Sequence, residues 1–139
     1  MRLTAGAALA AVTLSGAIAL AAPQPPALYT ATQATAGEGA YLAACAACHG
    51  VRLEGGAGPP LSGERFRTRT RQAHLRVGDV FSAVAKQMPL NQPASLPHER
   101  YVAIMAYLLK ENGYPSGTAA LAYDGALRSK VVMTSYRTP

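Results

Sequence analysis

The chain has 139 residues, of which 50% are hydrophobic and 14% are charged, a composition that excludes a disordered polyelectrolyte. Its net charge is +6, but no basic run interleaved with stacking aromatic residues is visible, so we expect no nucleic acid partner. With 7 tyrosines, 2 phenylalanines and no tryptophan, a large aromatic core is excluded, and a domain this small often relies on a staple, a metal or a cofactor.

The N-terminal segment has the pattern of a secretory signal. A short positive start precedes an uncharged, alanine-rich stretch over residues 3–22, which ends in small residues at a plausible cleavage site. We therefore expect a signal peptide over residues 1–21 and an exported, periplasmic protein. The same stretch is long enough to span a bilayer, so its retention as an anchor in the inner membrane stays open.

Composition divides the rest of the chain into three parts. Residues 22–35 are rich in proline, alanine and threonine and predict a flexible lead-in. Residues 36–113 carry the motifs described below and predict a single domain. Residues 114–139 form a C-terminal extension, which either wraps around its own domain or docks on a larger subunit.

The motif Cys45-Ala46-Ala47-Cys48-His49 carries the strongest chemical signal. C-x-x-C-H is the attachment pattern of c-type haem, because two thiols reach the two vinyl groups on one porphyrin edge and the adjacent imidazole lies under the iron. A zinc site would need a second ligand pair, and the chain has no further cysteine. A thioredoxin-type pair would need a βαβ context, and a disulfide within the motif would close a strained loop. We expect one covalently bound haem c, tethered by Cys45 and Cys48, with His49 as an iron ligand.

With its flanking residues, this motif resembles the class I cytochrome c family over roughly residues 36–113. Gly37 and Tyr41 stand eight and four positions before the first cysteine. The resemblance implies an N-terminal helix on which these two residues meet Ile104 and Tyr107 of the last helix. It also implies an all-α class, the small cytochrome c fold, with three main helices around one haem.

The segment Gly58-Pro59-Pro60-Leu61 matches the Gly-Pro-x-Leu segment of the same family. The resemblance implies that the Pro59 carbonyl accepts the ring N–H of His49, which fixes the tautomer of the ligand and raises its basicity. It also implies that Leu61 packs against the haem.

Met88 is the expected sixth ligand of the iron. It precedes a proline and lies 39 residues after His49, where the family carries its axial methionine, and a thioether ligand raises the reduction potential. A preceding helix is expected to end near Lys86 and to present Met88. Its apolar residues recur at i, i+3, i+4 and i+7; they are Val77, Val80, Phe81 and Val84. We expect Leu61 and Phe81 to belong to the hydrophobic shell of the haem.

The last helix is predicted over residues 97–111. A proline suits its first turn, and Asn112-Gly113 supplies its stop. Met105 lies within this helix and is expected to fill the core, and Met133 belongs to the extension. His74 and His98 are expected at the surface or as capping groups.

An arginine-rich stretch covers residues 65–71. Between Arg52 and Arg76, six arginines stand against two glutamates, and both a solvated basic face and a docking patch fit this balance. Relatives often carry a tryptophan where this chain has Thr70, and we expect Thr70 or one of the arginines to hydrogen-bond a haem propionate.

These features predict an electron carrier and not an enzyme. With His49 and Met88 both bound, the iron has no open position, which leaves one-electron transfer. We expect redox protein partners, with single electrons passing from a dehydrogenase to a terminal oxidase or another cytochrome. Residues 111–117 resemble the small cytochromes that accompany pyrroloquinoline-quinone (PQQ) dehydrogenases, which implies a cytochrome subunit of such a complex.

Two other classes stay open. One is a haem protein with an open sixth site, which binds gas or performs peroxidase-like chemistry with His74 or His98 as its distal group. The other is a cofactor subunit whose role is to stabilise a larger enzyme.

Overall fold

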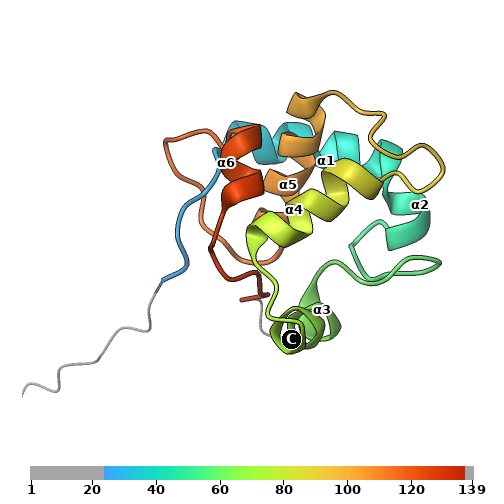
Figure 1. The fold of residues 1–139 in the computed structure, drawn as a ribbon, viewed down its shortest axis with the longest axis horizontal. Helices are drawn as coiled ribbons and strands as arrows, with labels where there is room; N and C mark the ends of the chain where they lie inside the picture. The colour runs from blue at the N-terminus through green and yellow to red at the C-terminus, as the bar shows by residue number, and fades with distance from the viewer. Residues whose placement is uncertain (1–23, 137–139) are drawn as a thin grey trace, which may run out of the picture.

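The computed structural model describes residues 24–136, and within them the chain forms six helices and no named strand (Figure 1). The helices are α1 (Ala31–Ala44), α2 (Ala46–His49), α3 (Gly63–Gln72), α4 (Val77–Gln87), α5 (His98–Glu111) and α6 (Tyr123–Arg128). One isolated antiparallel bridge joins Arg76 and Val132. The predicted all-α class is confirmed, and the three expected main helices are α1, α4 and α5.

α1 begins before residue 36, where the sequence placed the start of the domain. A capping box starts the helix: the Thr30 hydroxyl accepts a hydrogen bond from the Gln33 backbone N–H at 3.3 Å, and the Gln33 side chain accepts one from the Thr30 N–H at 3.2 Å. The expected lead-in over residues 22–35 is therefore helical from Ala31 onward. The expected signal peptide lies outside the described residues. Between residues 24 and 136, no helix is long and apolar enough to cross a membrane.

α1 and α5 form the most extensive helix pair of the described chain. The backbone of Gly37 lies against the Ala103 carbonyl group and the Tyr107 side chain, with no room for a Cβ atom. The Tyr41 and Tyr107 rings meet with their centroids 5.3 Å apart. The predicted crossing at Tyr107 is thus found, and the atoms nearest to Gly37 belong to Ala103 and Tyr107. Ala103 and Tyr107 are four residues apart and share a helix face, and Ile104 lies on the adjacent one.

The extension beyond residue 113 folds back over its own domain. α6 packs against α4 and α5, and the Tyr123 ring meets Phe81 edge-on with centroids 5.2 Å apart. The Gln33 side chain exchanges two hydrogen bonds of 2.9 Å with the backbone of Leu121. The Gly117 N–H donates to the Tyr29 carbonyl at 2.7 Å. These contacts tie the extension to both ends of the predicted domain.

The last described residues, 129–136, form a strap along the start of α4 and the end of α5. The Val77 and Gly78 N–H groups of α4 donate to the carbonyls of Val131 (2.8 Å) and Ser129 (3.2 Å). These are N–H groups that a helix start otherwise leaves without a partner. Further backbone bonds run from Met133 N–H to the Leu75 carbonyl (2.9 Å) and from Tyr136 N–H to the Asn112 carbonyl (2.8 Å). The strap thereby joins the α3–α4 corner to the end of α5.

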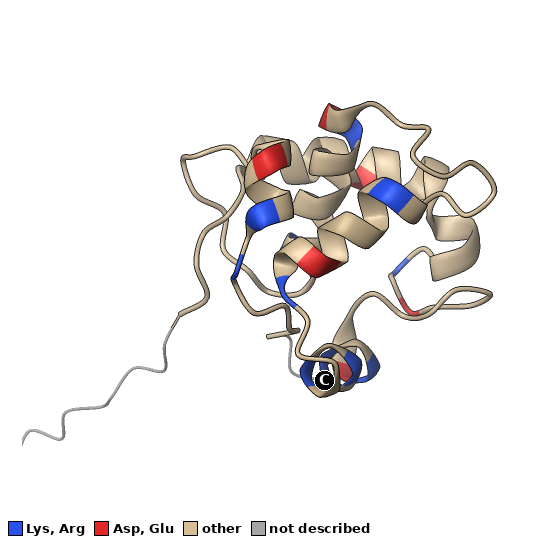
Figure 2. Ribbon diagram, in the orientation of Figure 1, with Lys and Arg blue, Asp and Glu red and all other residues tan. Residues whose placement is uncertain are grey.

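α3 stands apart from the other helices. Among the helices of the described chain, none packs against it, and it lies at one side of the molecule in Figure 1. Only Phe66 and Thr70 of its residues are buried. In Figure 2 the ribbon of this helix is largely blue, the colour of Lys and Arg. Arg65, Arg69 and Arg71 are exposed, and Arg67 pairs with Glu64. The space between α3 and the rest of the protein is the site described next.

Candidate haem site

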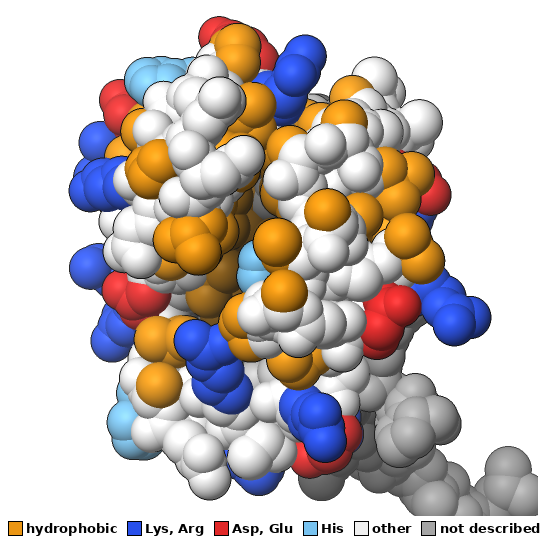
Figure 3. Space-filling view, turned by 90° about the vertical axis from the view of Figure 1, so that its right-hand side faces the viewer, with side chains coloured by type: hydrophobic (Ala, Val, Ile, Leu, Met, Phe, Trp, Pro, Cys, Tyr) orange, Lys and Arg blue, Asp and Glu red, His pale blue; other side chains and the backbone are white. Residues whose placement is uncertain are grey.

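An apolar cavity of about 240 Å³ separates α3 from α1, α4 and α5. Figure 3 looks onto a face where hydrophobic side chains border a hollow that holds a histidine side chain. Five of the six predicted site residues line the cavity, namely Cys45, His49, Pro59, Leu61 and Met88. The other lining residues are Tyr41, Phe66, Arg69, Thr70, Leu75, Asp79, Val80, Ala83, Val84, Ile104 and Leu108. The structure therefore brings together residues that are separated by more than forty positions in the sequence.

His49 is oriented by the loop that follows it. Its Nδ1 lies 2.8 Å from the Pro59 carbonyl oxygen, and because a carbonyl only accepts, Nδ1 carries the proton and donates. The other ring nitrogen, Nε2, is then the one with a lone pair for a metal. A Cβ atom on Gly58 would lie 2.8–3.2 Å from the imidazole ring, so a glycine is needed where the loop passes the ring. This geometry matches the bond that the resemblance implied.

The two cysteines occupy different environments. Cys45 is half-buried and lines the cavity, and Cys48 is exposed on the same turn. His49 N–H donates to the Cys45 carbonyl at 2.9 Å, so Cys45 and His49 stand on one face of a helical turn. Burial and the nearby Cys48 raise the pKa of the Cys45 thiol to about 11. The two cysteines form no disulfide with each other, so both sulfur atoms are available for haem attachment.

Met88 caps the C-terminus of α4 and is half-buried at the cavity. Its backbone is held by Tyr101, whose hydroxyl donates to the Met88 carbonyl at 2.7 Å and accepts from Leu96 N–H at 3.2 Å. Tyr101 lies in the predicted last helix, and no partner for its hydroxyl was predicted. A buried tyrosine needs a hydrogen-bond partner for its hydroxyl. This need, on a helix that follows the Met88 loop, was the feature from which the contact could have been predicted.

The hydrophobic shell differs from the prediction at one residue. Leu61 lines the cavity as expected, but Phe81 does not; it packs against Tyr123 of α6. The apolar face of α4 is wide enough to serve two neighbours, so Val80 and Val84 face the cavity and Phe81 faces the extension. The sequence pattern could not divide this face, because nothing in it indicated that α6 folds back onto α4.

α3 contributes one charged side chain to the lining. The Thr70 hydroxyl is engaged within its own helix, with the Phe66 and Arg67 carbonyls at 3.0 and 3.1 Å. Arg69 is the only lining residue with a positively charged side chain, whereas Asp79 accepts a hydrogen bond from the Arg76 N–H at 2.7 Å. Of the two donors considered for a haem propionate, Arg69 is the one this geometry favours.

Among residues 24–136, the remaining histidines and methionines do not line the cavity. Met105 and Met133 are fully buried in the core, and His74 is exposed. His98 stacks on Tyr123 with ring centroids 3.7 Å apart. Within residues 24–136, no group of three histidine, cysteine or acidic side chains could hold a metal ion.

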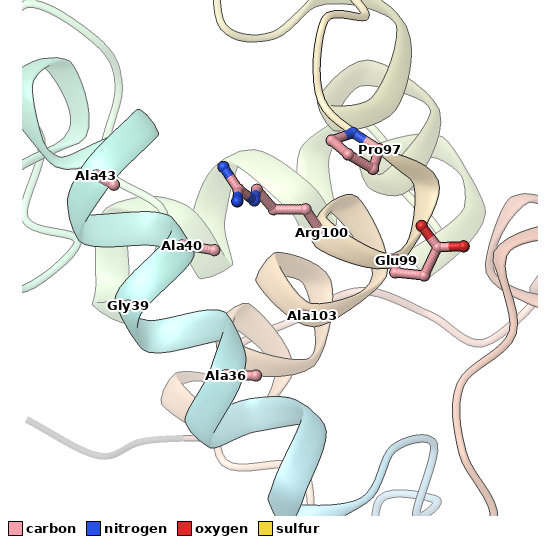
Figure 4. A pocket seen from close by; sticks show the side chains of 8 residues that line it. All are labelled: Ala36, Gly39, Ala40, Ala43, Pro97, Glu99, Arg100 and Ala103. Carbon is pink, nitrogen blue, oxygen red and sulfur yellow. The ribbon is translucent and has the colours of Figure 1, made fainter.

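A larger and more open groove runs along the other side of the α1–α5 crossing (Figure 4). It measures about 540 Å³ and is lined mostly by small residues of α1 together with the start of α5. Those residues are Ala36, Gly39, Ala40, Ala43, Pro97, Glu99, Arg100 and Ala103. None of them is a histidine, cysteine or methionine, so the groove offers no soft or imidazole ligand for haem iron.

The residues of the smaller cavity fit a haem. They supply an apolar lining, a thiol beside an imidazole, a fixed tautomer with Nε2 available, and a thioether. A bound haem c supplies reversible one-electron chemistry at its iron. The chain's own residues orient the imidazole through Pro59, exclude water with the side chains of α4 and α5, and place a cationic side chain, Arg69, at the lining.

The comparison with known families agrees with this assignment. A family model described as cytochrome c oxidase, cbb3-type, subunit III matches residues 32–108, more than half of the chain. The match runs from the first turn of α1 to Leu108 in α5 and includes the cavity. No curated protein sequence matches the chain. The chain therefore belongs to the cytochrome c family represented by this model, and its cofactor is one covalently bound haem c.

Proposed function

We propose that this protein is an exported electron carrier that takes single electrons from a dehydrogenase and passes them to a terminal oxidase or another cytochrome. The observation that carries the proposal is the composition of the cavity lining, which includes one histidine and one methionine, His49 and Met88. Ligation of the iron by both leaves no position for a substrate. Electron transfer is also the usual role of this family.

The alternative with an open sixth site has less support. Peroxidase-like chemistry needs an acid–base group beside the iron, and His74 and His98 were the candidates. Neither lines the cavity, and His98 is engaged with Tyr123. Asp79 is the one carboxylate of the lining, and it already accepts the backbone hydrogen bond that starts α4.

The optical spectrum of the purified holoprotein tests the closed site. The oxidised protein should show the weak near-infrared band of methionine ligation, and the reduced protein should not shift its spectrum under carbon monoxide. Met88→Ala should remove the band and admit carbon monoxide. Met133→Leu is the matched control, because Met133 is buried outside the cavity and this change conserves volume. A carbon monoxide shift in the unchanged protein would contradict the proposal.

For the partner, we propose the cytochrome subunit of a PQQ-type dehydrogenase complex. The resemblance over residues 111–117 supports it. Exposed Arg65, Arg69 and Arg71 on α3 favour a partner with an acidic face. The matched family's name points instead to an oxidase as the protein with which such domains assemble.

Kinetics can separate these partners. Fast reduction by a purified PQQ-type dehydrogenase with its substrate, slowed by rising ionic strength, supports the dehydrogenase assignment. Reduction that is slow at every ionic strength, together with fast oxidation by a terminal oxidase, would contradict it and leave the wider role as an electron carrier intact.

We also propose that the protein works outside the cytoplasm after removal of residues 1–21, with a haem domain that begins near the start of α1. Covalent attachment of haem c is made on exported proteins, and proteins of this family are usually exported or periplasmic. Both facts support export. N-terminal sequencing of the mature protein tests this assignment. A mature protein that begins at Met1 and fractionates with membranes would support the anchor instead.

A further inference from the structure

Asn112 is fully buried at the end of α5, and its side chain reaches the haem loop. Its Nδ2 atom donates to the Leu61 carbonyl at 2.9 Å and to the Leu108 carbonyl at 2.8 Å. Because both partners are carbonyls, the amide group must be oriented with its nitrogen toward them. The bond to Leu108 serves the helix end, but the bond to Leu61 joins two segments 51 positions apart in sequence.

The loop that Asn112 holds is the one that orients His49. The Leu61 side chain lines the cavity, and the carbonyl that accepts the His49 ring proton belongs to Pro59, two residues earlier. The other end of this loop is fixed to the haem-attachment motif, since Gly55 N–H donates to the His49 carbonyl and Gly58 N–H to the Cys48 carbonyl, both at 2.8 Å. The Asn112 side chain therefore links the loop to α5.

A role in stability alone explains Asn112 poorly. Its Oδ1 atom is buried without a hydrogen-bond partner among the described residues. An apolar side chain of similar size would avoid the cost of burying this oxygen, but it would leave the Leu61 carbonyl without its Asn112 donor. An apolar side chain could reproduce neither directed bond of Nδ2, and of the two only the bond to the Leu61 carbonyl reaches the haem loop.

We propose that Asn112 is a positioning residue for the proximal histidine. By holding the backbone of Leu61, it fixes the Pro59 carbonyl against Nδ1 of His49, and it thereby sets the basicity of the imidazole at the iron. This inference rests on the proposed function only in taking His49 as an iron ligand, and it does not depend on Met88 or on the partner.

The test compares Asn112→Leu with Tyr29→Phe in the holoprotein. Asn112→Leu removes two side-chain hydrogen bonds at the end of α5. Tyr29→Phe removes one near the same end, because the Tyr29 hydroxyl donates to the Tyr114 carbonyl at 2.7 Å, but Tyr29 does not line the cavity. Asn112→Leu should raise the midpoint potential, because a weaker bond to Pro59 makes the imidazole a poorer donor to the oxidised iron. It should also speed solvent exchange of the His49 ring proton. Tyr29→Phe should lower Tm and change neither readout.

An unchanged potential and an unchanged ring-proton exchange in Asn112→Leu would overturn the proposal. If that variant does not accumulate, Asn112→Ala removes the same side-chain donor with a smaller side chain. It should shift the potential in the same direction, and no shift in it would overturn the proposal equally. Failure of the electron-carrier proposal would look different, since it would appear as carbon monoxide binding to the unchanged protein.

Discussion

The α1–α5 crossing and the α3 side of the cavity are built from the same chain but held by different means. At the crossing, backbone lies against backbone at Gly37 and Ala103, and the Tyr41 ring meets Tyr107. α3 packs against no other described helix; it is held by Phe66 at the cavity and by the bond from Arg67 to the Ser135 carbonyl of the strap at 3.4 Å. The first region is protein packed on protein, and the second depends on what fills the cavity.

Removing the haem should have the largest effect on stability, and it should affect the two regions to different extents. In a Cys45→Ala/Cys48→Ala variant without haem, α3 should lose amide protection, because it packs against no other described helix and faces the cavity that the haem would fill. α1 and α5 should keep more of their protection. Hydrogen exchange followed by mass spectrometry measures both regions at once. Equal loss in α1, α3 and α5 would mean that the crossing also depends on the haem.

Overpacking the α1–α5 crossing should have the next largest effect on stability. Gly37→Ala places a Cβ atom against the Ala103 carbonyl, where neither helix backbone can give way, and it should lower the free energy of unfolding by about 3 kcal/mol. Gly39→Ala is the matched control on the same helix, because a Cβ atom there meets open space. That change should raise stability by about 0.5–1 kcal/mol. Denaturant unfolding of the two holoproteins measures the difference, and equal stabilities would contradict the close approach.

The two regions also differ in how well the sequence predicts them. The crossing and the attachment motif depend on particular residue types at short, regular spacings, such as Gly37 with Tyr41 and the C-x-x-C-H run. Both could therefore be predicted from the sequence. The strap depends on backbone bonds, such as Met133 N–H to the Leu75 carbonyl, and any residue except proline can donate one. Hence the detailed path of the extension, the neighbour of Phe81 and the bond from Asn112 to the Leu61 carbonyl were not predicted.

The strap can be tested at the point where it touches α4. In Gly78→Ala, a Cβ atom would lie 2.6 Å from the Leu127 carbonyl oxygen and 2.8 Å from that of Ser129. The extension is a single segment that can shift, so the cost should be smaller than at Gly37, about 1–2 kcal/mol. Exchange of the Val77, Gly78 and Met133 amides should speed up, while the amides of α1 keep their protection. Unchanged exchange at all three amides would contradict the capping role of the strap.

We expect the smallest effect on stability from ionisation of Tyr114, which would weaken the hydrogen bonds of the strap at alkaline pH. Its hydroxyl donates to the Val132 carbonyl at 2.7 Å and accepts from Thr134 N–H at 3.1 Å. Burial raises the pKa of this phenol from 10.0 to about 12. Because the unfolded chain ionises first, the contribution of Tyr114 is fully present below pH 10 and is lost as the pH rises toward 12. Tyr114→Phe gives up the two hydrogen bonds, at a cost of about 1 kcal/mol, and should flatten this part of the pH–stability curve. A curve that falls equally in both proteins between pH 10 and 12 would place the alkaline transition in another group.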